Sequence, residues 1–102
     1  MGASFTLRVQ FFANLREIIG IKETSINFSE NQSVDDLLQI LRKSYPNGEE
    51  FYQNVVDEAN QNLQPYVKII IDGRILFNNI ALNTIISPDV KTILIFPPVG
   101  GG

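Results

Sequence analysis

The residues best suited to chemistry lie at the C-terminal end. The last seven are Phe96, Pro97, Pro98, Val99, Gly100, Gly101 and Gly102. A terminal carboxylate is a poor electrophile, so transfer of its acyl group requires activation, and adenylation by ATP would turn one oxygen into a good leaving group. Gly101 and Gly102 have no Cβ to block a narrow active-site channel. The ending therefore predicts that another protein activates the Gly102 carboxylate.

The residues before the glycines suit an arm that enters such a channel. Pro97 and Pro98 hold φ at about −65°, so the segment leaves the preceding strand extended. From Pro97 to Gly102 the chain spans roughly 20 Å at full extension. Ordering each residue costs about 1–2 kcal/mol, and stiff prolines reduce that cost. We expect Phe96 to Gly100 to contact the partner.

Two residue types are absent, and this narrows the chemistry. Without Cys there is no disulfide, thiol nucleophile or Cys-based metal site. Without His there is neither the usual general base near neutral pH nor the commonest metal ligand. No pair of carboxylates has a spacing that indicates acid–base catalysis. We expect a protein that is not an enzyme by itself and binds no metal or cofactor.

Length, composition and charge describe one acidic domain. The chain has 102 residues, of which 44% are hydrophobic and 19% charged, enough for one modest core. Its formal net charge of −3 argues against nucleic acid as a partner. No apolar run approaches the roughly 20 residues of a membrane-spanning helix. We expect a cytoplasmic protein with a single domain over residues 1–102, residues 97–102 being its flexible tail.

The first half of the chain predicts two strands and a helix. Residues 5–11 and 24–29 each alternate between apolar and polar side chains, which suggests an antiparallel pair of half-buried strands. A turn of helix between them ends at Gly20. Apolar residues at positions 34, 37, 38 and 41 form one stripe of a longer helix. Ser33 is its expected N-cap, with Asp36 in a capping-box position, and residues 46–48 end it.

The second half is expected to add strands and a shorter helix. Apolar residues at positions 51, 55, 59 and 63 favour a helix, although the polar residues 60–62 equally suit a loop. Residues 67–71 form a largely apolar strand, and Asp72-Gly73 predicts a hairpin into residues 74–77. Residues 93–96 read as a strand buried on both faces. The order predicts an α+β fold with a mixed sheet of four to five strands.

Two segments resemble one protein family. The ending FPPVGGG and the opening VQFFANLREIIG (residues 9–20) are similar to those of the small sulfur carrier of molybdopterin synthase, in the MoaD/ThiS family of ubiquitin-like proteins. The resemblance runs from about residue 5 to residue 102. Residues 88–91 depart from the family's frequent Gly-Asp turn, which leaves the register of the last strand open. Residues 45–66 look like an insertion, and Gly100 adds a third glycine to the tail.

This resemblance implies a fold, partners and roles. The fold would be the β-grasp, with one main helix packed on one face of the sheet. An E1-like adenylyltransferase would activate the Gly102 carboxylate with ATP and Mg²⁺, and a sulfur donor protein would convert it to a thiocarboxylate. The tail would then enter the large catalytic subunit of molybdopterin synthase. Gly101 would give access, and residues 96–100 would form the threaded arm.

Residues outside the tail are candidate partner contacts. Phe12 falls on the face of the first strand opposite its core residues, so it is a candidate for an exposed apolar docking patch. Ile70 and Leu94 point away from the inner faces of their strands and would continue that patch. Arg16 is most simply a solvated residue at a turn. The resemblance adds partner contact as an alternative for Arg16.

Other functions are compatible with the same ending. Activated Gly102 would also serve a protein modifier that forms an isopeptide bond with a lysine. A sulfur carrier would alternatively serve the thiamine thiazole or a tRNA base. A ubiquitin-like interaction module would need no C-terminal chemistry at all. Deleting Gly101 and Gly102 separates these classes, because only the interaction module would keep its function.

Overall fold

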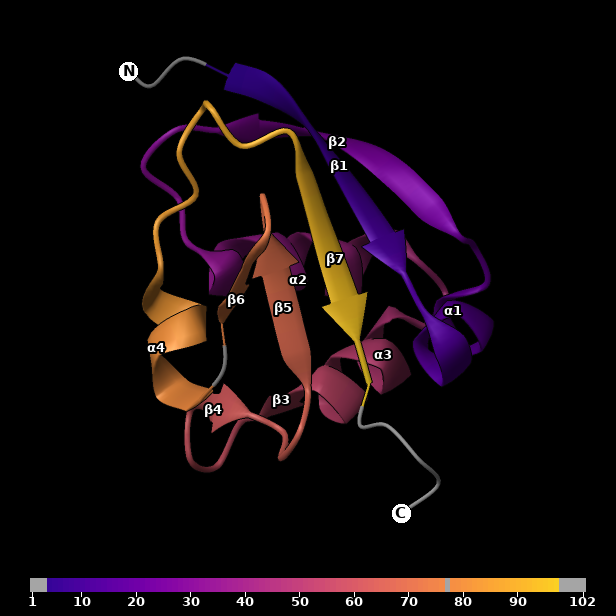
Figure 1. Cartoon of the computed structure of the whole chain (residues 1–102). Coiled ribbons are helices and arrows are strands. Elements are labelled where there is room, and N and C mark those ends of the chain that lie inside the picture. Colours follow the sequence, from indigo (N-terminus) through magenta and orange to yellow (C-terminus); the bar gives the residue numbers. More distant parts are fainter. Residues whose placement is uncertain (1–3, 77, 98–102) are drawn as a thin grey trace.

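A mixed sheet of five strands forms the centre of the molecule. The computed structural model describes residues 4–97 apart from Phe77, and only the backbone of Asn78 and Asn79. In spatial order the strands are β2 (Glu23–Ser29), β1 (Ser4–Phe11), β7 (Thr92–Phe96), β5 (Lys68–Ile71) and β6 (Arg74–Leu76). β1 pairs antiparallel with β2 and parallel with β7, and β5 pairs antiparallel with β7 and β6. β7 therefore lies in the middle of the sheet (Figure 1).

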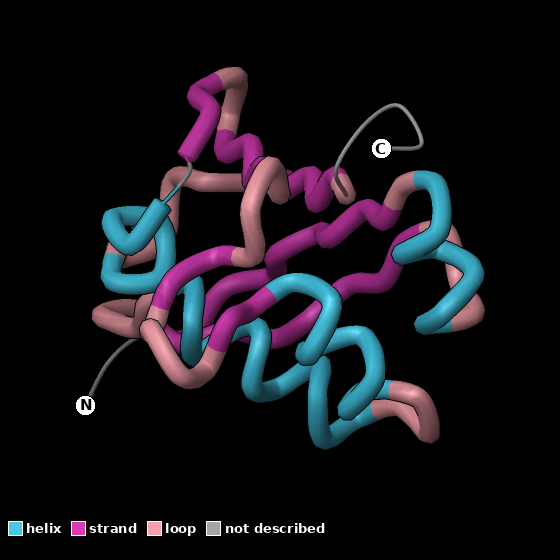
Figure 2. Tube along the Cα trace, turned by 90° about the horizontal axis from the view of Figure 1, so that it is seen from below, coloured by secondary structure: helices cyan, strands magenta, loops and turns pink. Residues whose placement is uncertain are grey.

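Helices and a small hairpin complete the described chain. The helices are α1 (Ala13–Ile19), α2 (Val34–Ser44), α3 (Gly48–Val55) and α4 (Asn78–Asn83). A two-stranded hairpin of β3 (Val56–Asp57) and β4 (Asn62–Leu63) follows α3. Seen from below, the longer helices gather on one side of the strands (Figure 2). In the described ranges, no helix is long and apolar enough to cross a membrane.

The period of β1 places its side chains on two faces of the sheet. Leu7, Val9 and Phe11 are fully buried, whereas Arg8 between them is exposed. The inner face of β7 continues this layer, because Val9 pairs with Ile93 and Phe11 with Ile95. The core lies between this inner face and the helices. Its largest fully buried side chains are Phe11, Phe28, Phe51, Leu7, Leu15, Leu37, Leu38, Leu41, Ile69, Ile71, Ile86 and Ile93.

The capping signals of α2 are confirmed. The Ser33 hydroxyl accepts the Asp36 N–H at 3.2 Å, and the Asp36 carboxylate accepts the Ser33 N–H at 2.8 Å. The helix buries the apolar stripe that the sequence predicted. The expected turn of helix after β1 is also present as α1, and Gly20 ends it with φ at 89°.

Two expectations about the second half need correction. The helix expected over residues 49–63 ends at Val55, because Val56 turns to extended backbone and pairs with Leu63 while Ala59 is exposed. β7 is buried on its inner face only, since Leu94 and Phe96 on the outer face are half-buried. The helix α4 was not predicted at all. The sequence left the register of β7 open. In the structure, Arg8 of β1 pairs with Thr92 of β7.

Candidate functional site

The base of the tail is fixed in the middle of the sheet. Phe96, the last residue of β7, pairs with Lys68 at the beginning of β5, and its neighbour Ile95 pairs with Phe11 at the end of β1. Pro97 follows and is buried. It also lacks the N–H that another ladder bond would need. The chain therefore leaves the sheet between β1 and β5, at the lower end of β7 in Figure 1.

Phe12 and Phe96 form an aromatic pair at this exit. Their rings stack with centroids 4.2 Å apart and planes 10° from parallel. Phe12 has extended backbone as the N-cap of α1, with no side-chain capping bond, and the next residue, Ala13, has φ at 52°. The backbone thus reverses directly after Phe12. Its ring stays half-buried on the outer side, whereas Phe11 points into the core.

Arg16 lies against the same pair. Its Nε donates to the carbonyl oxygen of Phe11 at 3.2 Å, and its guanidinium carbon is 5.9 Å from the centroid of the Phe12 ring. Arg16 is the fourth of the seven residues of α1, so the helix places it over the end of β1. The structure therefore brings together three residues that the sequence singled out, Phe12, Arg16 and Phe96.

An apolar row crosses the outer face of the sheet beside this cluster. Leu94 on β7 pairs with Ile70 on β5, and Ile70 pairs with Ile75 on β6. Leu94 and Ile70 are half-buried, and Ile75 is 49% exposed. Lys68 precedes this row on β5 and is exposed. The predicted outward direction of Ile70 and Leu94 is confirmed.

The rest of the predicted tail lies outside the described residues. These are Pro98, Val99, Gly100, Gly101 and Gly102. Their roles stay predictions, and the described part of the site consists of the exit at Phe96 and Pro97 with the side chains around it.

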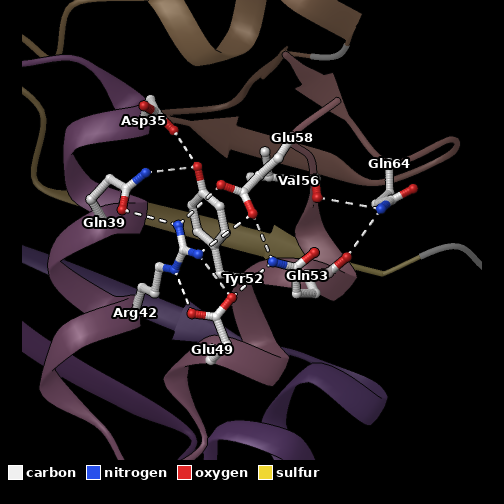
Figure 3. A network of polar contacts seen from close by, with 9 residues as sticks. All are labelled: Asp35, Gln39, Arg42, Glu49, Tyr52, Gln53, Val56, Glu58 and Gln64. Carbon is white, nitrogen blue, oxygen red and sulfur yellow. Dashed lines mark hydrogen bonds and ion pairs between the residues drawn. The ribbon is translucent and has the colours of Figure 1, made fainter. Parts of the chain in front are cut away.

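A pocket lies on the helix side of the molecule. The pocket, of about 310 Å³, is lined by Asp35, Gln39, Tyr52, Val56, Glu58, Gln61, Leu82 and Asn83. Figure 3 shows the polar network along its wall. The Tyr52 hydroxyl donates to Asp35 at 2.9 Å and accepts from Gln39 at 2.9 Å. Burial, and then the hydrogen bond to Asp35, raise the pKa of Tyr52 to about 12.

Arg42 is the centre of this network. Its guanidinium lies over the Tyr52 ring, 4.3 Å from the centroid, and forms two 2.8 Å hydrogen bonds with the Glu49 carboxylate. A further bond at 3.2 Å reaches Glu58. The hydrogen bonds from Arg42 lower the pKa of Glu49. These contacts join α2 to α3 and to the turn that follows β3, so the network has a structural role.

Among the described residues, no group of three His, Cys, Asp or Glu is placed to hold a metal ion. The carboxylates of the helix-side network are engaged with Arg42, Tyr52 and Gln53. The functional argument for the tail exit rests on its own contacts, the stacking of Phe12 on Phe96 and the position of Arg16 against them.

Sequence reasoning missed one feature near the exit. Tyr66, which precedes β5, is 80% exposed and has φ at 69°. The signal was present as Pro65-Tyr66, since proline commonly occupies the second position of a tight turn. The sequence does not show that the tyrosine occupies the position where positive φ is required.

The sequence is similar to known proteins over most of its length. Residues 9–102 match the ThiS family. The chain is also 26% identical over 96 residues to small archaeal modifier protein 3 of Haloferax volcanii, which covers 94% of this chain and 98% of that relative.

Solved structures share the fold over nearly the whole chain. Small archaeal modifier protein 1 from Methanosarcina acetivorans is 29% identical with a TM-score of 0.67, covering 99% of this chain and 100% of that one. A protein from Pyrococcus furiosus described as molybdopterin converting factor, subunit 1, has a TM-score of 0.67 at 24% identity. The match covers 94% of this chain and 100% of that one. The expected ubiquitin-like β-grasp fold is thereby confirmed. The chain belongs to the ThiS family.

Proposed function

We propose that this protein is a sulfur carrier for molybdopterin biosynthesis and that its reactive group is the Gly102 carboxylate. The observation that carries the proposal is the position of the tail exit. In the sequence, Gly101 and Gly102 come shortly after the central strand β7. The last residue of β7, Phe96, pairs with Lys68 of β5 and stacks on Phe12. A rigid base lets a partner hold the domain while the arm reaches a separate active site.

The chemistry would take place on partner enzymes. An E1-like adenylyltransferase would bind ATP and Mg²⁺, a Gly102 carboxylate oxygen would attack the α-phosphorus, and pyrophosphate would leave. Hydrosulfide supplied by a sulfur donor protein would then attack the acyl carbon, AMP would leave with the electrons of the broken C–O bond, and loss of the sulfur's proton would give a thiocarboxylate. The large catalytic subunit of molybdopterin synthase would use that sulfur for the dithiolene of the pterin. The carrier itself supplies the acyl group and the docking surface.

The described side chains support such docking. The outer face presents an apolar row of Leu94, Ile70 and Ile75 beside the stacked Phe12 and Phe96. Apolar and aromatic surface next to a reactive tail suits a partner that covers both at once. Arg16, held over Phe12, would add a cation at the edge of the same surface.

The experiment that tests the proposal is an intact-mass measurement. The protein would be recovered from its own cells without reducing or hydrolysing treatment, beside a matched variant that lacks Gly101 and Gly102. We expect a species in which sulfur replaces one oxygen, localised to Gly102 by fragmentation and absent from the variant. An unmodified carboxylate, unchanged after incubation with a matching adenylating enzyme, ATP and a sulfur source, would contradict the carrier function.

A second candidate function is protein modification. The relatives at 26% and 29% identity are named small archaeal modifier proteins, which supports conjugation as an alternative use of activated Gly102. The same mass measurement on cell extracts separates the two. Peptides in which Gly102 is joined to a lysine ε-amino group would promote the modifier. Transfer of sulfur to the pterin precursor by the large subunit would favour the carrier.

A further inference from the structure

The loop before β5 contains a tight turn with an unusual residue. The Val67 N–H donates to the Gln64 carbonyl oxygen at 3.1 Å, which closes a four-residue turn over residues 64–67. Pro65 is its second residue, and Tyr66, with φ at 69°, is its third. Proline followed by a positive φ identifies a type II turn, in which glycine is favoured at the third position.

Tyrosine at this position is not explained by stability. A side chain with Cβ is disfavoured at positive φ, so glycine would be the more stable choice. Tyr66 is 80% exposed as a residue, so packing does not offset the strain. Among the described residues, four other non-glycine residues have positive φ, and Tyr66 is the only aromatic one of the set; the others are Ala13, Asn31, Gln61 and Asp72. A strained, exposed aromatic side chain is a candidate for function.

The location of Tyr66 indicates what that function is. β5 begins two residues later at Lys68, which pairs with Phe96, the last residue of β7. Tyr66 thus belongs to the end of the sheet at which the chain leaves it, as Figure 1 shows for the beginning of β5 and the end of β7. Phe12 directly follows β1, which lies on the other side of β7 from β5. Aromatic residues therefore flank the tail exit from both neighbouring strands.

We propose that Tyr66 is a docking residue for the adenylating enzyme that receives the tail. This inference rests on the proposed function and deepens it, since any enzyme that takes the arm beyond Pro97 must cover this end of the sheet. The ring is apolar and its hydroxyl is a hydrogen-bond donor, so the enzyme would offer an apolar slot with an acceptor at its end. Tyrosine is enriched among the residues that dominate binding at interfaces.

The test is the kinetics of adenylation with three variants. Pyrophosphate release by the adenylating enzyme of the same organism would be followed as a function of carrier concentration. For Tyr66→Gly we expect KM to rise about tenfold with kcat within about twofold, because the ring contacts the enzyme but no reacting atom. Its urea midpoint should rise, because the turn loses its strain. Tyr66→Phe should keep most of the affinity.

Gln61→Gly is the matched control for the backbone change. Gln61 is an exposed residue with φ at 54° on the β3–β4 hairpin, so this substitution relieves a similar strain without removing an aromatic ring. Its KM should equal that of the unaltered protein. An unchanged KM for Tyr66→Gly would overturn the inference while adenylation of the unaltered protein still supported the carrier function. Absence of adenylation in the unaltered protein would overturn both.

Discussion

Phe12 stacks on Phe96 and thereby ties the first residue after β1 to the last residue of β7. The centroids are 4.2 Å apart, and the planes are 10° from parallel. Because β1 and β7 are parallel neighbours, the contact lies just beyond their last paired residues, Phe11 and Ile95. The stack therefore holds the Phe96 side chain against Phe12 where the tail begins.

We expect Phe12 and Phe96 to be energetically coupled. Aromatic pairs contribute about 0.5–1.5 kcal/mol beyond the area that they bury. A double-mutant cycle with Phe12→Ala and Phe96→Ala, measured by urea unfolding, should give a coupling in that range. The control cycle joins Phe12→Ala with Phe5→Ala, because Phe5 packs edge-to-face on Phe28 instead. That cycle should be additive within about 0.5 kcal/mol. Additivity in the first cycle as well would show that the stack contributes no coupling.

Removing the cap of α2 should destabilise the protein. The Ser33 hydroxyl accepts the Asp36 N–H, which has no partner within the helix, so Ser33→Ala leaves that donor without its capping bond. The free energy of unfolding should fall by about 0.5–2 kcal/mol. Ser44→Ala, at the other end of α2, removes only a hydroxyl bonded to Ile40 of the same helix, and should stay within about 0.5 kcal/mol. Equal losses would contradict a capping role.

Local patterns predicted the elements whose side chains follow one period. The two-residue alternation gave β1 and β2, and the stripe with its capping box gave α2, because a single amphipathic face decides each of them. The tail was found because its residue types have few other uses. These parts of the fold and site required no knowledge of distant contacts.

The missed parts depend on contacts between distant segments. Val55, Ala59 and Leu63 have the four-residue spacing that favours a helix, yet Leu63 pairs with Val56 in a hairpin. Leu94 and Ile70 continue the apolar character of their strands on the outer face, so the sequence cannot distinguish a docking face from a second buried one. The contacts of Phe12 and Arg16 likewise follow from the chain reversal at Ala13, where alanine rarely adopts positive φ.

Gly48 is expected to resist substitution for steric reasons. A Cβ at this position would overlap the backbone carbonyl of Arg42 and approach the Leu41 carbonyl oxygen to 2.7 Å, where α3 begins beside the end of α2. Gly48→Ala must separate the two helices, so we expect a loss of about 1–3 kcal/mol in urea unfolding. Asn47→Ala is the control, since Asn47 makes no side-chain capping bond and should change stability by less than about 0.5 kcal/mol. A neutral Gly48→Ala would mean that the helices can move apart freely.

Tyr52 should make stability fall at high pH. Burial and the bond to Asp35 raise the pKa of Tyr52 from 10.0 to about 12. Its contribution is therefore complete below pH 10. Between about pH 10 and 12 the unfolded chain ionises this group while the folded protein keeps it protonated, so the free energy of unfolding decreases as pH rises. The free energy of unfolding, measured with urea across this window, should fall more steeply for the unaltered protein than for Tyr52→Phe. That variant retains the same lysines and the other tyrosines. Parallel curves would show that Tyr52 ionises equally easily in both states.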